Sequence, residues 1–168
     1  MVLRFADRVL ANSQASASVV KKLSGQDAMV IYRGTKTQII EQCDPDQKTA
    51  EAYRGKTVIA FIGRLIDGKG TRDLITALAR LKRTDIVTFI IGGGPEEMHL
   101  KKMTTEHCLE NQVIFFGNLP FEKALGVLKT ADIVVNPRYT EGLPTSVTEA
   151  ALCRKAIIAT DVGGTREV

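Results

Sequence analysis

Two glutamates and the loop between them are the residues of this sequence best suited to chemistry. Glu141 follows a short apolar run, and Glu149 is expected in the first turn of the next helix, so both carboxylates can face one crevice. Carboxylates placed in this way accept hydrogen bonds from the hydroxyls of a sugar or a ribose. Purely structural roles stay open, because Ser146 and Glu149 also have capping-box spacing and Glu141 could be an exposed loop charge.

Two cations stand between an apolar run and a helix expected from about Thr71. They are Arg64 and Lys69, five residues apart. Arginine binds phosphate through two parallel hydrogen bonds, lysine supplies a point charge, and a helix N-terminus adds N–H groups and partial positive charge. The pair suits a diphosphate, although two ordinary solvated cations would look the same.

Two glycine-containing loops are further candidates for ligand contact. In Gly92-Gly93-Gly94-Pro95 the glycines permit close approach of the backbone to a ligand, and Pro95 is expected at the first helical position. The second loop, Gly117-Asn118-Leu119-Pro120, has polar backbone groups that could pair with a planar base. Tight strand-to-helix turns with no ligand would have the same composition.

Short apolar runs alternate with amphipathic segments from Lys56 onward, which is typical of βαβ units feeding a parallel sheet. The runs are continuous in Val, Ile and Phe, so helices should cover both faces of the sheet. We therefore predict an α/β, doubly wound parallel sheet, in which ligands lie beyond the carboxyl ends of the strands. The expected strands are residues 57–62, 86–91, 113–116, 133–135 and 156–160.

Residues 1–55 are interpreted as an interdomain or crossover segment, and residues 56–168 as a donor-binding domain. The first part is expected to hold strands at 8–11 and 29–32, a helix at 13–23, and a polar linker or surface helix over 38–55. Within that polar stretch, Asp44-Pro45-Asp46 is interpreted as a solvated turn and not as a metal site. The domain is expected to be truncated at its C-terminus, because a doubly wound domain would continue into another helix.

Composition favours a cytoplasmic protein. The longest apolar run is far shorter than the roughly 20 residues of a membrane span, and the N-terminus carries charges where a secretory signal needs apolar residues. The three cysteines have neither disulfide-framework nor zinc-ligand spacing. The net charge of +4 suits an anionic ligand, but no basic cluster with interleaved aromatics predicts a nucleic-acid partner.

From about Asp7 to the end, an ordered series of motifs resembles glycosyltransferase family 4, the group 1 retaining GT-B enzymes. The most specific motif is the pair of glutamates with seven residues between them. The others are Gly63-Arg64-Leu65 with Lys69-Gly70, the loops at 92–95 and 116–119, Ala159-Thr160-Asp161-Val162-Gly163-Gly164, and the stretch 7–13 before the domain crossover.

The resemblance implies the Rossmann-like, nucleotide-sugar-binding half of a GT-B fold. The implied reaction is transfer of a sugar, of hexosyltransferase type, from a nucleoside diphosphate to a hydroxyl acceptor with retention, in cell-surface polysaccharide or glycolipid biosynthesis. It implies no metal or other cofactor. The implied partners are the nucleotide sugar and an N-terminal acceptor domain, without which the isolated chain is expected to be inactive. A peripheral contact of the full enzyme with the inner face of the membrane stays open.

The resemblance also implies roles for individual residues. The catalytic residues are Arg64 and Lys69, which bind the diphosphate, and Glu141, which contacts the transferred sugar. Glu149 holds the ribose, the base rests near Asn118 and Leu119, and the backbone near Gly142 lines the sugar-phosphate pocket. The full substrate-binding set is Gly63, Gly93, Asn118, Leu119, Gly142, Leu143, Pro144, Thr145 and Glu149.

Two departures from the family pattern stand out. Arg138 replaces a small serine and is expected to alter the mouth of the pocket. The acceptor domain and its histidine have no counterpart here, and His99 and His107 are interpreted as surface or core residues. A nucleotide-sugar epimerase, a non-catalytic nucleotide-sugar-binding module and a purely structural domain remain alternatives. The sequence does not identify the base, the sugar or the acceptor.

Overall fold

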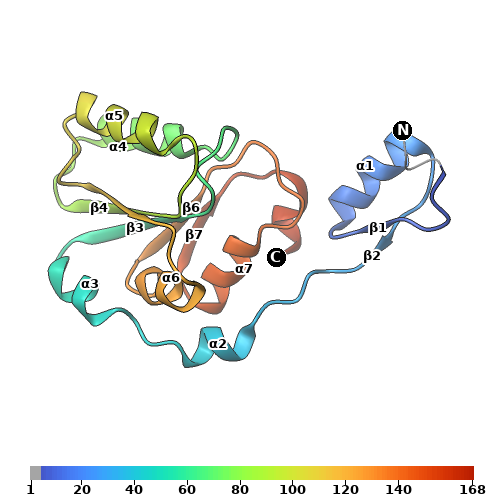
Figure 1. The fold of residues 1–168 in the computed structure, drawn as a ribbon, viewed down its shortest axis with the longest axis horizontal. Helices are drawn as coiled ribbons and strands as arrows, with labels where there is room; N and C mark the ends of the chain where they lie inside the picture. Colours follow the sequence, from blue (N-terminus) through green and yellow to red (C-terminus); the bar gives the residue numbers. More distant parts are fainter. Residues whose placement is uncertain (1–4) are drawn as a thin grey trace.

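The computed structural model describes residues 5–168 (Figure 1). Its main part is a parallel sheet with the strand order β5-β4-β3-β6-β7, which confirms the predicted doubly wound fold. Each strand lies within one residue of its expected bounds. The strands are β3 (Thr57–Ile62), β4 (Ile86–Ile91), β5 (Val113–Gly117), β6 (Ile133–Asn136) and β7 (Ala156–Ala159).

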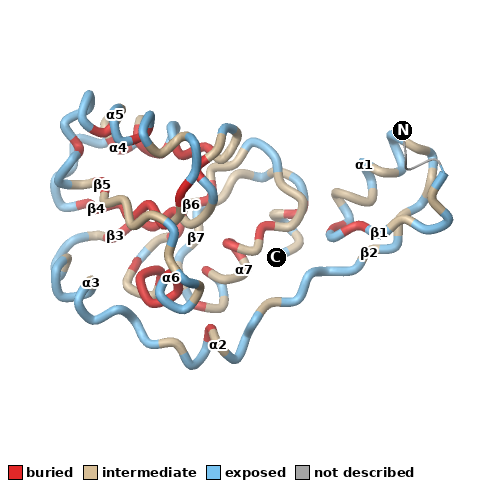
Figure 2. Tube along the Cα trace, viewed as in Figure 1, coloured by how far each residue is buried: buried red, intermediate tan, exposed pale blue. Residues whose placement is uncertain are grey.

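Helices cover both faces of this sheet because consecutive residues of the central strand are buried on opposite sides. Val58 and Ala60 of β3 pack in the cluster formed with helices α6 (Phe121–Leu128) and α7 (Thr145–Leu152). Ile59 and Phe61 pack in the other cluster, with α4 (Thr71–Leu81) and α5 (Glu97–Glu106). Buried residues accordingly concentrate along the strands and the inner sides of these helices (Figure 2).

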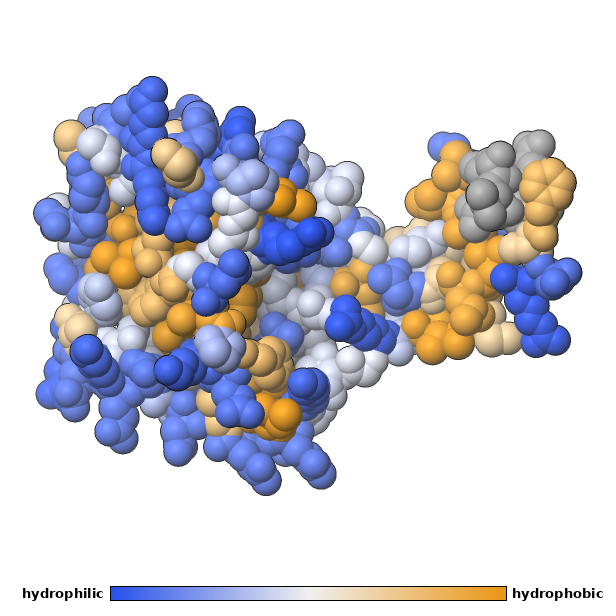
Figure 3. Space-filling view, in the orientation of Figure 1, coloured by the Kyte–Doolittle hydropathy of each residue, from blue (hydrophilic) through white to orange (hydrophobic). Residues whose placement is uncertain are grey.

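A small βαβ unit stands apart from the main sheet. Strands β1 (Leu10–Ala11) and β2 (Met29–Val30) pair in parallel around helix α1 (Gln14–Ser24), and an extended segment joins the unit to the main part (Figure 1). Apolar side chains gather on its surface (Figure 3).

The C-terminal turn η2 (Gly163–Glu167) ties this unit to the main sheet. The Glu167 carboxylate accepts hydrogen bonds from the backbone N–H groups of Gln14, at 2.7 Å, and Ala15, at 3.0 Å. The N-terminus of α1 is thereby held beside the last turn of the chain. The division into residues 1–55 and 56–168 stays a prediction.

The polar stretch at 38–55 is largely helical, which is one of the two forms expected for it. It forms helices α2 (Thr37–Gln42) and α3 (Gln47–Ala52), and Ile40 is fully buried against the core. Asp46 begins α3 by accepting a hydrogen bond from the Thr49 N–H at 2.8 Å. This aspartate therefore has a structural role that a solvated turn would not give it.

Two expectations about helix starts were wrong. Helix α7 begins at Thr145 after Pro144, and no side chain within residues 5–168 caps it, so the pair Ser146 and Glu149 is not a capping box. The backbone of Pro144 already marks the helix start, which leaves Ser146 inside the first turn. Helix α5 begins at Glu97 after Glu96, so Pro95 precedes the helix and is not its first residue.

Strand order brings the loops after β3 and β6 together. The chain runs outward from β3 through β4 and β5, then returns to the other side of β3 for β6, which opens a crevice beyond the carboxyl ends of these two strands. Gly70 permits close contact there, because its φ is 72° and a Cβ on it would lie 1.8 Å from the Pro137 carbonyl oxygen. The Tyr139 N–H also donates to the Gly68 carbonyl at 3.0 Å. Lys69 is thus fixed opposite the loop that carries Arg138 and Glu141.

Candidate functional site

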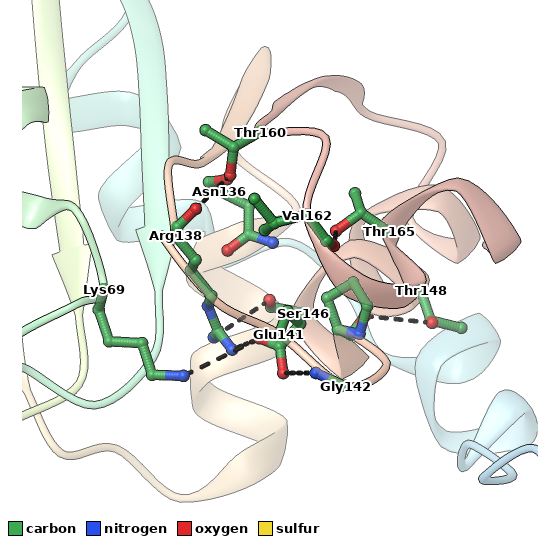
Figure 4. A network of polar contacts seen from close by, with 11 residues as sticks. Lys69, Asn136, Arg138, Glu141, Gly142, Ser146, Thr148, Thr160, Val162 and Thr165 are labelled. Atoms are coloured by element: carbon green, nitrogen blue, oxygen red, sulfur yellow. Dashed lines mark hydrogen bonds and ion pairs between the residues drawn. The ribbon is translucent and has the colours of Figure 1, made fainter. Parts of the chain in front are cut away.

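A cluster of three charged side chains lies in the crevice between β3 and β6 (Figure 4). The Arg138 guanidinium pairs through Nη1 with Oε2 of Glu141, and Lys69 Nζ lies 3.9 Å from the same oxygen. The other oxygen of Glu141 accepts the Gly142 N–H at 3.1 Å. Only 14% of the Glu141 side chain and 11% of the Arg138 side chain are exposed, so this cluster is largely shielded from water.

Arg138 lies among the ends of β3, β6 and β7 and the first turn of α7. Arg138 follows β6 in the chain, and its backbone carbonyl accepts a hydrogen bond of 2.5 Å from the Thr160 hydroxyl at the end of β7. Its Nη2 lies 3.5 Å from the Ser146 hydroxyl in the first turn of α7, and a Cβ on Gly63, after β3, would lie 3.0 Å from the same nitrogen. The arginine expected at the mouth of the pocket lies instead within the ionic cluster.

The cluster has more positive than negative charge. Burial lowers the pKa of Lys69 below that of an ordinary lysine, and repulsion from Arg138 and Arg64 lowers it further, against the attraction of Glu141. Arg64 is exposed, and it forms no ion pair with any residue in 5–168. Three cations facing one carboxylate leave the crevice suited to an anionic ligand.

The crevice opens into a cleft of about 470 Å³ with a wall that the sequence did not predict. Lys69, Glu141 and Gly142 line one side, and Ala15, Ser16 and Val19 of α1 line the other. The resemblance of residues 7–13 to a stretch next to a domain crossover was the only signal in the sequence for this wall. It did not reveal that α1 folds back onto the strand ends.

Glu149 lies one turn into α7 and differs from Glu141 in its surroundings. Its carboxylate is partly buried, and no described residue donates a hydrogen bond to it. Burial raises the pKa of Glu149, and the positive charge of Arg33 partly opposes that rise. A carboxylate kept without a partner destabilises the fold, which is typical of a group reserved for a ligand.

The N-terminus of α7 offers backbone donors near the cluster. Within residues 5–168, the Thr145 and Ser146 N–H groups have no acceptor, whereas those of Val147 and Thr148 donate to the Pro144 carbonyl at 3.1 and 3.2 Å. Leu143 is partly buried and Pro144 is buried. These residues, expected around a sugar-phosphate pocket, therefore lie at the end of the loop that carries Glu141.

The glycine loop after β4 packs against its neighbouring loops. The Leu65 N–H donates to the Gly93 carbonyl at 2.9 Å, and a Cβ on Gly93 would lie 2.8 Å from Asn118 Nδ2. Close loop packing therefore explains these glycines without a ligand. Asn118 is exposed and Leu119 packs at the edge of the core, so the residues expected near the base lie beside this loop. The predicted roles of all these residues stay predictions.

Other candidate groups lie away from the crevice. Asp44 and Asp46 pack beside α6, where the Asp46 N–H donates to the Gly126 carbonyl at 2.9 Å, and His99 and His107 are exposed on and after α5. Over residues 5–168, no group of three or more His, Cys, Asp and Glu side chains could hold a metal ion. In the same part of the chain, every helix is too short or too polar to cross a bilayer.

Comparison with known proteins identifies related chains. The family model described as Glycosyl transferases group 1 matches residues 44–168. An uncharacterized glycosyltransferase of Methanocaldococcus jannaschii is 32% identical to the whole chain, which covers 44% of that relative. The GPI3 subunit of phosphatidylinositol N-acetylglucosaminyltransferase from Saccharomyces cerevisiae is 32% identical over 96% of the chain and 37% of the relative.

Solved structures show the same architecture. The crystal structure of Anabaena HepE in complex with UDP and glucose aligns with a TM-score of 0.85 and 26% identity, over 99% of this chain and 47% of HepE. The chain therefore spans less than half the length of these relatives.

Proposed function

The chain belongs to the group 1 glycosyl transferases, and we propose on that basis that it binds the donor of a retaining, hexosyltransferase-type GT-B enzyme. The donor would be a nucleoside-diphosphate sugar, and the sugar would pass to a hydroxyl acceptor. The observation that carries the proposal is the excess of cations, Arg64, Lys69 and Arg138, around Glu141 at the point where the strand order reverses. A UDP-sugar is the first donor to test, because HepE was solved with UDP and glucose.

The proposed chemistry depends on stabilising the leaving group. When the bond between sugar and phosphate breaks, negative charge grows on the diphosphate. Arg64, Lys69 and the unpaired N–H groups at the start of α7 would stabilise that charge, in a site whose dipoles are already oriented. We assign Arg64, Lys69 and Glu141 as catalytic residues on this argument, with Glu141 facing the transferred sugar.

The nucleoside would lie along the neighbouring strand ends. The Glu149 carboxylate has no hydrogen-bond partner among the described residues and suits the ribose hydroxyls, and Asn118 and Leu119 lie near enough to the glycine loop to border a base. Gly63 and Gly93 would form the floor between the phosphate and base regions. The proposed site thus runs along the carboxyl edge of the sheet from α7 toward β5.

An acceptor domain would complete the cleft from the side of α1. Leu10 and Met29 on the βαβ unit are 62% and 60% exposed, and the relatives are more than twice as long as this chain. We propose that the acceptor domain includes this unit and covers these side chains. The yeast relative is named as the GPI3 subunit of phosphatidylinositol N-acetylglucosaminyltransferase, which supports a cell-surface glycolipid or polysaccharide acceptor at the cytoplasmic face of a membrane.

Calorimetric titration of the wild-type chain with UDP, UMP and UDP-glucose tests the proposed function. We expect UDP to bind more tightly than UMP, and we expect equal donor affinity in EDTA and in magnesium, because the cations of the crevice take the place of a metal. GDP and ADP sugars serve as comparison ligands for the base. Absence of binding by every nucleoside diphosphate would contradict the proposal, and a strict need for magnesium would contradict its metal-free form.

A further inference from the structure

Arg138 uses its guanidinium in a way that differs from other paired arginines of this chain. Arg72, Arg83 and Arg166 each hold a carboxylate through Nε and Nη2, which form one edge of the guanidinium. Arg138 instead reaches Glu141 through Nη1. Its Nε is buried and has no hydrogen-bond partner within residues 5–168, and in the same part of the chain its Nη2 has only the Ser146 hydroxyl at 3.5 Å.

The unused edge is the part of the side chain that binds oxyanions best. Two parallel N–H groups match the oxygens of a carboxylate or a phosphate, and such pairs are among the stronger hydrogen bonds in proteins. A buried donor without a partner is unfavourable and calls for an explanation. Here Nη2 lies between Gly63 and the Ser146 hydroxyl in the first turn of α7, the turn whose Thr145 and Ser146 N–H groups have no acceptor within residues 5–168.

The charges around Arg138 are also unfavourable unless an anion is present. A cation at a helix N-terminus meets partial positive charge from the helix, and Lys69 and Arg64 add like charge nearby. Glu141 compensates for one of the three positive charges. The remaining charge of two matches that of a nucleoside diphosphate esterified to a sugar.

We propose that Arg138 is a third donor-binding cation, whose Nε and Nη2 edge binds a phosphate of the donor diphosphate. This assignment rests on the proposed function and adds a residue to its site. The guanidinium turns about its side-chain torsions to expose Nε when the diphosphate enters. Nη1 then releases Glu141, so the carboxylate becomes available to the hydroxyls of the transferred sugar.

Titration of Arg138→Ser and Arg138→Lys with UDP, UMP and UDP-glucose tests the assignment. We expect Arg138→Ser to weaken UDP and UDP-glucose binding by about 10- to 100-fold and to change UMP binding much less. Arg138→Lys keeps the positive charge but lacks the two parallel N–H groups, so its UDP affinity should fall between those of the wild type and the serine variant. Arg83→Ser is the matched control, because it removes an arginine from an exposed carboxylate pair at the opposite edge of the sheet.

Each outcome separates the assignment from its alternatives. A UDP affinity in Arg138→Ser equal to that of the wild type would overturn the assignment and leave the proposed function standing. A loss confined to UDP-glucose would place Arg138 at the transferred sugar and also overturn it. If Arg138→Ser does not fold, the lysine variant decides: a UDP affinity of Arg138→Lys equal to that of the wild type would overturn the assignment. Failure of the wild type to bind UDP would overturn the proposed function and this assignment together.

Discussion

Replacing Arg64 by alanine is expected to abolish most of the preference of the chain for a nucleoside diphosphate over the matching monophosphate. Arg64 is exposed and forms no ion pair with another described residue, so its removal should leave the fold intact. One charge-assisted hydrogen bond is worth about 1.5–3 kcal/mol, which corresponds to a loss of about 10- to 100-fold in diphosphate affinity. Titration of UDP and UMP against the wild type and the variant gives the two ratios.

Arg80→Ala is the control for Arg64. Arg80 is also exposed, and it lies in the last turn of α4, at the far end of the helix that begins after Lys69. Its removal changes the net charge equally and should leave the diphosphate preference unchanged. An unchanged diphosphate preference in Arg64→Ala would contradict a role of Arg64 in the site. Equal losses of that preference in both variants would mean that Arg64 acts only through the net charge of the chain.

Replacing Glu149 by glutamine is expected to weaken nucleotide binding and to raise the melting temperature at neutral pH. Burial holds the pKa of Glu149 above its unfolded value. The protonated form therefore stabilises the fold at low pH, and that contribution is lost as the pH rises through the folded pKa. Glutamine has no charge to bury, so the destabilisation at neutral pH disappears. The ribose loses a charged acceptor, which weakens UDP and UDP-glucose binding alike by about 10-fold or more.

The pH dependence of affinity distinguishes this role from a structural one. In the wild type, nucleotide affinity should rise with pH through the raised pKa of Glu149, because the ionised carboxylate is the better acceptor. The glutamine variant should lack that rise. Glu122→Gln is the matched control, since Glu122 is exposed in the first turn of the neighbouring helix α6. A lower melting temperature with unchanged affinity in Glu149→Gln would mean that Glu149 only stabilises the helix.

The sheet was predictable because its strands are continuous runs of β-branched and aromatic residues. Runs such as Ile86–Ile91 are buried over their whole length, which the absence of polar alternation already indicates. The helix starts were harder to predict. At α7 a spacing rule favoured Ser146 as the cap, but Pro144, two residues earlier, holds that position and the helix begins at Thr145. Local patterns thus located the elements better than their ends.

Contacts between residues far apart in the chain could not be predicted from the sequence. Arg138 was recognised as unusual, but its pairing with Glu141 beside Lys69 depends on β6 returning to lie against β3. The contact of Glu167 with the N-terminus of α1 joins opposite ends of the chain. The motifs therefore indicated which loops to inspect, whereas the ionic cluster and the α1 wall follow from the tertiary structure.

A second groove on the molecule is an alternative place for the nucleotide to bind. It measures about 780 Å³, and Cys43, Lys129 and Lys155 are among its lining residues. Lys129 and Lys155 precede β6 and β7, so this groove lies at the amino ends of the strands, opposite the proposed site. Its size would also suit a nucleotide, and its cations Lys129, Arg154 and Lys155 outnumber the carboxylates Glu41 and Asp44.

Hydrogen exchange of the chain with and without UDP decides between the two places. We expect UDP to protect amides in residues 63–70 and 142–149, at the carboxyl edge of the sheet. Residues 41–45 and 152–155 should exchange as they do without ligand. Protection confined to those latter segments would place the nucleotide in the second groove and contradict the proposed donor site.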